Sequence, residues 1–207
     1  MSKLIRAVVI SLDGDVLDLV SDLADIEVLG FLDAQASAGD SGFSNLGNDE
    51  TWLTLKEQEP ELRAILAADP PKLRKRLATF YGLSALLTVI APGARVSPTA
   101  NVGQGTLIQA SVLVSRNVRL GHGCKINYGA ALHHDVAVGN FSTVAPYALV
   151  LGTASIGEEC YVGAGAVVMP RRKVGDGAMI GAGAIVTRDV PPGATTIGVP
   201  ARIVSSA

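Results

Sequence analysis

The hydrophobic pattern of this chain is dominated by one repeat in its second half. An aliphatic residue returns at every sixth position from Ile90 to Val186. An α-helix repeats near 3.6 residues and a half-buried strand near 2, so neither explains this spacing. A strict six-residue period is typical of a parallel β-helix built from hexapeptides, three of which form one triangular coil. The repeat therefore predicts a prism, with each aliphatic side chain pointing into it.

A second register of small residues supports this prediction. The residue two places before each aliphatic position is usually small, as at Ala94 and Thr106. An inward position near a corner of the prism has little room, which accounts for the choice. Cys124 and Cys160 fall in this register two coils apart. At one strand spacing per coil they lie about 9–10 Å apart, too far for a disulfide. We expect two buried free thiols, as in a reducing cytoplasm.

The first part of the chain has a different pattern, which predicts a small α/β unit. The polar, Gly/Ser-rich segment 34–48 is expected to be a loop. Apolar runs predict strands over 4–10, 26–32 and 62–67, and helices over 15–24 and 72–81. This strand–helix–strand order predicts a parallel sheet with a ligand crevice at the carboxyl ends of its strands.

The turn after the first predicted strand bears on what the crevice binds. Residues 11–15 hold one glycine and two carboxylates. A phosphate loop presents backbone N–H groups, often from glycines, and carboxylates would repel the phosphate. The turn therefore argues against dinucleotide binding.

Composition and charge narrow the class of ligand. The chain has 207 residues, enough for one large or two modest domains, and its 4% aromatics and 23 glycines suit a stacked aliphatic prism. Residues 1–90 carry 8 Lys/Arg against 14 Asp/Glu (net −6), and residues 91–207 carry 9 against 5 (net +4). The basic half indicates a small anionic ligand, because its surplus is too small and scattered for a nucleic-acid surface. With no signal peptide or transmembrane span visible, we expect a cytoplasmic protein without membrane insertion.

Four motifs carry a resemblance to a known family. They are HDVAVG at 134–139, VAP at 144–146, IGAGA at 180–184 and GVPAR at 198–202. With them, nearly the whole chain resembles the sialic acid O-acetyltransferase/sugar N-acetyltransferase family of hexapeptide acyltransferases, and it is similar to bacterial UDP-amino-sugar N-acetyltransferases. The resemblance implies a small Rossmann-like α/β subdomain over 1–87 that binds a nucleotide sugar, followed by a left-handed parallel β-helix over 88–207. It also implies a homotrimer that holds acetyl-CoA in the groove between neighbouring prisms.

The chemistry of such a transferase depends on a base. The base takes a proton from an amine or hydroxyl as that group attacks a thioester. His134 lies two residues past the inward Leu132, where a side chain points outward. The resemblance aligns His134 with the catalytic histidine of the family, and Asp135 with the acidic residue that follows it. The alternative is a solvated surface pair. His133 replaces what is often an acidic residue, and His122 matches no family role.

Repeat arithmetic adds a second candidate. Gly152 lies eighteen residues beyond His134, hence one coil above it, and leaves room over the imidazole for a thioester. The resemblance matches Gly152 to a position whose N–H holds the acetyl carbonyl oxygen, a contribution of about 3–4 kcal/mol. The alternative is a plain turn glycine. Ala164 and Ala182 match backbone contacts to the pantetheine arm. The run RRK at 171–173 either meets CoA phosphates or is a solvated charge run.

Departures from the family pattern fall in the nucleotide-sugar site. Thr143 stands in place of a second histidine, the usual glycine-rich turn begins here at Ser11, and the Gly-Asp near the third strand reads Ala68-Asp69. Asp33, at the end of the second predicted strand, is expected to contact ribose or uracil. We therefore take Ser11, Asp33, Asp69 and Thr143 as substrate-binding candidates. Zinc hydratases on this fold need three histidines, two of them about five residues apart, so no metal is expected.

Three functions stay open at this point. The preferred one is acetyl-CoA-dependent N-acetylation of a nucleotide-linked amino sugar in bacterial glycan synthesis, with His134 as general base. The second is O-acetylation of a sugar such as sialic acid, with the same base. The third is a non-catalytic trimeric paralogue, which the altered turn at 11–15 favours, whereas His134, Asp135 and Gly152 favour the enzymes. The pattern shows no obvious apolar side of the prism, but its groove must be covered, so we expect a homotrimer.

Overall fold

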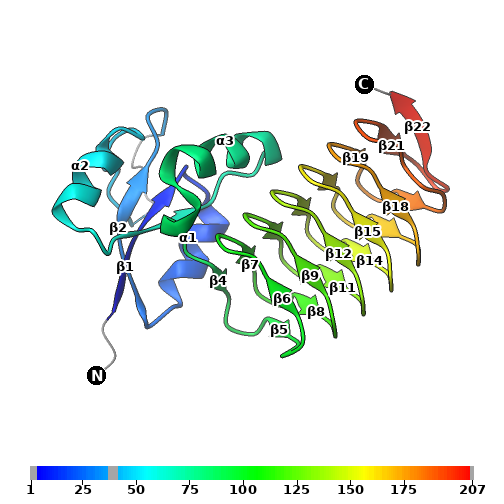
Figure 1. The fold of residues 1–207 in the computed structure, drawn as a ribbon, viewed down its shortest axis with the longest axis horizontal. Helices are drawn as coiled ribbons and strands as arrows, with labels where there is room; N and C mark the ends of the chain where they lie inside the picture. Colours follow the sequence, from blue (N-terminus) through cyan, green and yellow to red (C-terminus); the bar gives the residue numbers. More distant parts are fainter. Residues whose placement is uncertain (1–3, 37–41, 206–207) are drawn as a thin grey trace.

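The structure of the protein is a computed structural model that describes residues 4–36 and 42–205. A small sheet flanked by helices lies at one end of a long, regular β-helix, and the described chain ends at the other end of the β-helix (Figure 1). No helix within the described residues is long and apolar enough to cross a membrane.

The three predicted N-terminal strands form one sheet. They are β1 (Ile5–Ile10), β2 (Ile26–Leu32) and β3 (Arg63–Leu66), in the order β2-β1-β3. Both pairs are parallel, so the carboxyl ends of all three strands lie at one edge. The last four residues of β1 are fully buried, as its apolar run predicts.

Two predicted helices cover this sheet. Helix α1 (Gly14–Ser21) begins at Asp13, whose side chain accepts a hydrogen bond from the Val16 N–H. It ends three residues earlier than expected, because the chain must turn there to enter β2. Helix α3 (Pro71–Tyr81) begins at two prolines and ends at Gly82, whose φ of 80° favours glycine.

A third helix was not predicted. Helix α2 (Thr51–Gln58) buries only Trp52, so its sequence carries no apolar stripe. Its start is fixed by Asn48, whose Oδ1 accepts from the N–H groups of Glu50 and Thr51. The preceding segment is a loop as expected, apart from residues 37–41, which lie outside the described residues. The single-turn 3₁₀ helix η1 (Leu83–Ala85) then leads into the β-helix.

The β-helix has three flat sides, each a stack of short parallel strands. Side 1 contains β4 (Val89–Ile90), β7 (Leu107–Ile108), β10 (Lys125–Ile126), β13 (Thr143–Val144), β16 (Tyr161–Val162), β19 (Met179–Ile180), β21 (Thr195–Ile197) and the antiparallel β22 (Arg202–Ser205). Side 2 contains β5 (Arg95–Val96), β8 (Leu113–Val114), β11 (Ala131–Leu132), β14 (Leu149–Val150), β17 (Val167–Val168) and β20 (Ile185–Val186). Side 3 contains β6 (Asn101–Val102), β9 (Arg119–Leu120), β12 (Ala137–Val138), β15 (Ser155–Ile156) and β18 (Lys173–Val174).

The interior confirms both registers. Strands of one side pair with a shift of eighteen residues, as between Leu132 and Val150, except that β19 pairs with β21 at a shift of sixteen. The aliphatic position is buried from Ile108 onward, but Ile90 is 41% exposed because the first coil has no coil beneath it. Cys124 and Cys160 are buried free thiols, and burial raises the pKa of Cys124 to about 12, so this thiol stays protonated.

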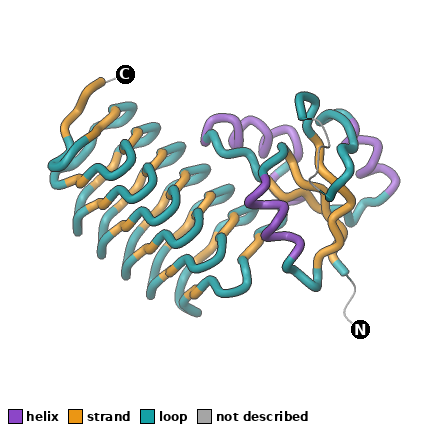
Figure 2. The backbone as a smooth tube through the Cα atoms, turned by 180° about the vertical axis from the view of Figure 1, so that it is seen from behind, coloured by secondary structure: helices purple, strands orange, loops and turns teal. Residues whose placement is uncertain are grey.

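The N-terminal unit packs on side 1 and on the corner between sides 3 and 1. Val89 and Leu107 pack against the core of the small sheet. Arg74 of α3 is 1% exposed and donates to the carbonyl oxygens of Gly123 and Phe141 on that corner. The corner between sides 2 and 3 therefore lies across the prism from the N-terminal unit. Figure 2 shows the β-helix extending away from the small sheet.

Side 2 corrects the expectation that no side of the prism is apolar. Its first outward position is Arg95, but those of the next five coils are apolar: Leu113, Ala131, Leu149, Val167 and Ile185. The corresponding positions of side 3 include Asn101, Arg119, Ser155 and Lys173. The prism thus has an apolar side, which the sequence pattern did not reveal because each outward residue stands alone between buried ones.

Candidate active site

His134 and Asp135 lie together on the corner between sides 2 and 3. The corner residues 133–136 connect β11 to β12. His134 Nδ1 lies 2.8 Å from Asp135 Oδ2, and the two side chains are 63% and 46% exposed. A carboxylate only accepts hydrogen bonds, so Nδ1 carries the proton and Nε2 of the neutral ring keeps its lone pair. This arrangement can abstract a proton at Nε2.

Asp135 is held from below by a residue that the sequence analysis missed. Asn117, eighteen residues earlier and one coil down, donates from Nδ2 to Asp135 Oδ1 at 3.0 Å. The hydrogen bonds from His134 and then Asn117 hold the pKa of Asp135 below its ordinary value, so it is a carboxylate at neutral pH. The spacing of eighteen was the signal that would have revealed Asn117.

Gly152 lies over the imidazole, as the repeat arithmetic predicts. A methyl group on Gly152 would lie 2.6 Å from His134 Nε2 and 2.8 Å from its Cε1. The coils are tied together here by the Thr153 N–H, which donates to the His134 carbonyl oxygen at 3.0 Å. Gly152 has no positive φ, so the turn itself does not require glycine. Among the hydrogen bonds of the described residues, none uses its N–H, which is free to meet a ligand.

Ala164 and Ala182 lie on a different corner from His134. They occupy the corner between sides 1 and 2, one coil apart, and the Gly183 N–H donates to the Ala164 carbonyl oxygen at 2.8 Å. Both residues are exposed. Within one chain, side 2 separates them from His134 and Gly152, so the structure does not bring the four residues together.

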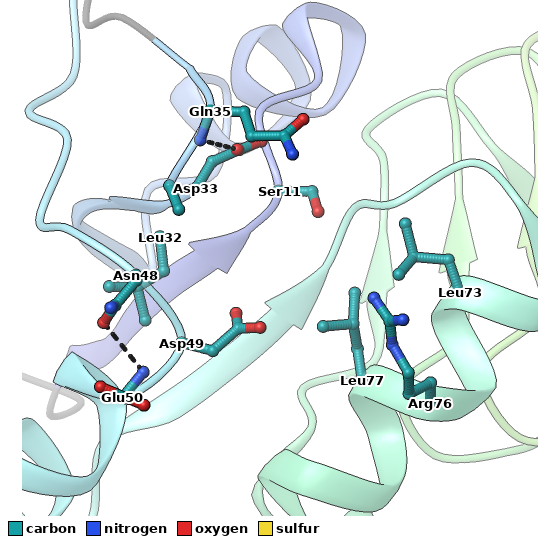
Figure 3. Close-up of a pocket in the computed structure, with 11 residues that line it drawn as sticks. Ser11, Leu32, Asp33, Gln35, Asn48, Asp49, Glu50, Leu73, Arg76 and Leu77 are labelled. Carbon is teal, nitrogen blue, oxygen red and sulfur yellow. Dashed lines mark hydrogen bonds between the residues drawn. The ribbon is translucent and has the colours of Figure 1, made fainter.

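A cavity of about 440 Å³ lies at the carboxyl ends of β1 and β2. Ser11 and Asp33 line it, together with Asp49 before α2 and Arg76 of α3. Figure 3 shows Asp49 and Arg76 pointing toward each other across the cavity, with Ser11 above them. The crevice expected at this edge of the sheet is therefore present, and a carboxylate and a guanidinium face into it.

Asp33 fixes the backbone around this cavity. Its Oδ2 accepts from the Leu12 N–H and its Oδ1 from the Gln35 N–H, both at 3.0 Å. Ser11 has a φ of 65°, a conformation that glycine adopts more readily. Ser11 thus adopts, at the start of this turn, a backbone conformation that is common for glycine.

The carboxylate of Asp13 is compensated, which changes the argument about phosphate repulsion. Asp13 Oδ2 lies 2.6 Å from Nζ of Lys125, a side chain only 3% exposed. Lys125 also donates to the Ala67 carbonyl oxygen and lies 3.5 Å from Asp69 Oδ1. Lys125 was missed because an outward position on a strand reads as solvent-facing. This cluster links the turns after β1 and β3 to side 1.

Asp69 and Thr143 differ in what they offer a ligand. The Asp69 side chain is 46% exposed beside the buried Lys125. Thr143 is fully buried, and its hydroxyl donates to the Asp69 carbonyl oxygen at 3.3 Å. The N-terminal unit covers Thr143, whose hydroxyl joins the two parts of the chain, and the contact of Thr143 with substrate stays a prediction.

His122, His133 and the basic run at 171–173 remain, and among the described residues they differ in whether a side-chain partner is present. His122 lies one coil above Gln104, and its Nδ1 accepts a hydrogen bond from the Gln104 N–H at 3.0 Å. This histidine therefore helps to join two coils. His133 is half-buried beside His134. In the basic run, Arg172 lies 3.5 Å from Asp189, and Arg171 is exposed. No cluster of three or more His, Cys, Asp or Glu able to hold a metal occurs in 4–36 and 42–205.

Comparison with family models and curated proteins gives one match. Residues 153–188 match the model described as bacterial transferase hexapeptide (six repeats). No curated protein sequence matches the chain.

Comparison with solved structures gives matches over nearly the whole chain. The acetyltransferase domain of PglB from Neisseria gonorrhoeae FA1090, in complex with acetyl coenzyme A, is 29% identical over 97% of this chain and 100% of that chain, with a TM-score of 0.91. PerB from Caulobacter crescentus, in complex with CoA and GDP-perosamine, is 30% identical over 97% of each chain, with a TM-score of 0.90. WeeI from Acinetobacter baumannii AYE is 25% identical over 98% of this chain and 100% of that chain, with a TM-score of 0.83.

Proposed function

Because the chain belongs to the sugar N-acetyltransferase family of hexapeptide acyltransferases, and is thus an acyltransferase that uses acetyl-CoA, we propose that it N-acetylates a nucleotide-linked amino sugar in bacterial glycan synthesis. The observation that carries the proposal is the His134–Asp135 pair with Gly152 over its free Nε2. Base, orienting carboxylate and a free N–H lie within one corner, as acyl transfer requires.

The proposed reaction follows from this arrangement. His134 Nε2 takes a proton from the sugar amine as the amine nitrogen attacks the thioester carbonyl carbon. The carbonyl oxygen becomes an oxyanion, which the Gly152 N–H stabilises. When the C–S bond breaks, the CoA thiolate leaves and takes the proton back from the imidazolium, so the base is restored. Asp135 stays a carboxylate throughout and keeps Nδ1–H in place.

The acceptor is proposed to bind through the N-terminal unit. We take residues 1–87 as a Rossmann-like domain and residues 88–207 as a left-handed β-helix domain that binds the acyl donor. The nucleotide would occupy the cavity beside Ser11 and Asp33, with the sugar near Asp69. GDP-perosamine in the PerB structure supports a nucleotide-linked sugar, since PerB matches this chain over both parts.

The site is proposed to form between chains of a homotrimer. In one chain the nucleotide cavity lies on the far side of the prism from His134, so a sugar held there cannot reach its own His134. The apolar outward residues of side 2 support the same assembly, because they are the residues that a neighbouring prism would cover. Ala164 and Ala182 of one chain would then face Gly152 and His134 of the next, with the pantetheine arm between them.

A panel of nucleotide-linked amino sugars, assayed for CoA release, tests the function. We expect turnover with at least one such sugar and none with the same sugars lacking the amine. Turnover of hydroxyl acceptors alone would replace N-acetylation by O-acetylation. No release with any acceptor, in a protein that binds acetyl-CoA, would favour the non-catalytic alternative.

A further inference from the structure

Within the described part of the chain, the Asp135 carboxylate has two hydrogen-bonding partners, and each uses a different oxygen. Oδ2 lies 2.8 Å from His134 Nδ1, and Oδ1 accepts from Asn117 Nδ2 at 3.0 Å. Asn117 comes from the coil below, whereas His134 is the neighbour of Asp135 in sequence. Among the described residues, no hydrogen bond joins Asn117 to His134 or to Gly152.

A second anchor matters because the pair itself is exposed. The side chains of His134 and Asp135 are 63% and 46% exposed, and a solvent-exposed contact between two side chains contributes little on its own. The carboxylate could otherwise rotate and leave Nδ1 to water. With Oδ1 held by Asn117, the plane of the carboxylate is fixed and Oδ2 faces Nδ1.

Asn117 is itself fixed by the repeat. Its φ is 57°, a conformation that asparagine tolerates better than most residues. Its N–H donates to Thr99 Oγ1 at 3.1 Å, and Thr99 lies one coil lower again. Thr99, Asn117 and Asp135 thus form a column in which each coil positions the next.

We propose that Asn117 is a positioning residue: it locks the Asp135 carboxylate so that His134 presents Nε2 to the substrate. This inference rests on the proposed role of His134 as the base. Asn117 contacts neither substrate nor acetyl-CoA in this role, so it should affect turnover rather than binding of the acyl donor.

The groups around Asp135 determine in which direction its pKa changes when Asn117 is replaced. His134 and Asn117 lower the pKa of Asp135 by hydrogen bonding, and Arg119 of β9 lowers it further by its charge. Loss of the Asn117 amide therefore raises the pKa of Asp135 toward its ordinary value. The carboxylate is then protonated at a higher pH than in the wild-type protein, which a titration of Asp135 detects.

The test uses two substitutions that keep the backbone conformation. Asn117→Gly removes the amide at a position where glycine is favoured, and Asn117→Asp replaces the donor by a second carboxylate. We expect kcat to fall about three- to tenfold in Asn117→Gly, the rate equivalent of one exposed hydrogen bond, and further in Asn117→Asp. KM for acetyl-CoA and the Tm should stay unchanged. Carboxyl NMR titration should show a higher pKa for Asp135 in both variants.

Ser111→Gly is the matched control. Ser111 lies in the same coil with a φ of 59° but on the corner between sides 1 and 2, so its loss should leave kcat and the Asp135 titration unchanged. Wild-type kcat and an unshifted Asp135 titration in Asn117→Gly, with His134→Ala inactive, would overturn the role of Asn117 alone. Near-normal turnover in His134→Ala would instead overturn the base, and the positioning role with it.

Discussion

At the scale of single residues, the function depends on one imidazole whose surroundings are set by the repeat. His134 is exposed at Nε2, bonded at Nδ1 and overlain by Gly152. These three conditions come from positions one residue or eighteen residues away, so they follow from the stacking of coils. Two experiments test them separately.

The first tests the base. His134→Ala should lower kcat about 10²–10⁴-fold, the usual contribution of a general base. Asp135→Asn should cost less, because it removes the group that orients the imidazole and leaves the imidazole in place. Steady-state CoA release with the true acceptor measures both. His133→Ala is the control, since His133 lies beside His134 and its side chain makes no hydrogen bond to another described residue. A near-normal rate in His134→Ala would refute the assignment.

The second tests the space above the imidazole. In Gly152→Ala the new methyl group would lie 2.6 Å from His134 Nε2, so the ring must move and the thioester loses its place. The ring is exposed and can swing outward, so the Tm should change little while kcat and affinity for acetyl-CoA fall. Calorimetric titration and a melting curve measure the two effects.

Gly139→Ala supplies the contrast for that experiment. There the methyl group would meet backbone atoms of Gly157 at 2.5 Å, and backbone cannot move aside as a surface side chain can. Its Tm should fall. If Gly152→Ala instead unfolds the protein and binds acetyl-CoA normally when folded, Gly152 is a structural glycine only.

At the scale of elements, the sequence predicts the strands of the β-helix well because every coil repeats the same six-residue spacing of aliphatic residues. The hexad positions and the spacing of Gly152 over His134 are independent of any distant contact. Helix α2 escaped prediction because only Trp52 in it is buried. The burial of Thr143 and Lys125 was not predicted, because the segment that covers them precedes them by more than 50 residues and a local pattern carries no information on such a contact.

Lys125 makes this contact testable. Lys125→Met keeps the length of the side chain but removes the buried partner of Asp13 and Asp69. Since both carboxylates are partly exposed, we expect a loss of about 1–3 kcal/mol, below the usual cost of breaking a fully buried pair. For a chain of this size that lowers the Tm by about 3–10 °C.

Lys75→Met is the control for Lys125→Met. Lys75 also joins the N-terminal unit to the β-helix, by a bridge to Glu159, but the Lys75 side chain is 48% exposed. An exposed bridge contributes at most about 1 kcal/mol, so the Tm should stay within a few degrees. Equal melting curves for the two variants would show that the buried cluster does not hold the unit in place.

At the scale of the whole molecule, the arrangement of the three sides points to assembly. One side carries the N-terminal unit, one is polar, and one presents apolar residues in five successive coils. Leu149→Glu would place a carboxylate on the apolar side at the level of Gly152, and we expect it to convert a trimer to monomers without turnover. Ser155→Glu on the polar side should remain a trimer. Light scattering measures the oligomeric state of each variant. A monomeric wild-type protein at micromolar concentration would refute the assembly.

A mixing experiment then asks whether each site takes residues from two chains. His134→Ala lacks the base and keeps the nucleotide cavity, whereas Asp33→Ala loses two backbone hydrogen bonds at that cavity and keeps the base. Each variant alone should be nearly inactive. If the cavity of one chain serves His134 of its neighbour, random mixed trimers regain activity at about a quarter of their sites, the share that pairs two intact halves. If both halves belong to one chain, refolding the two variants together restores nothing, because no chain in the mixture has both.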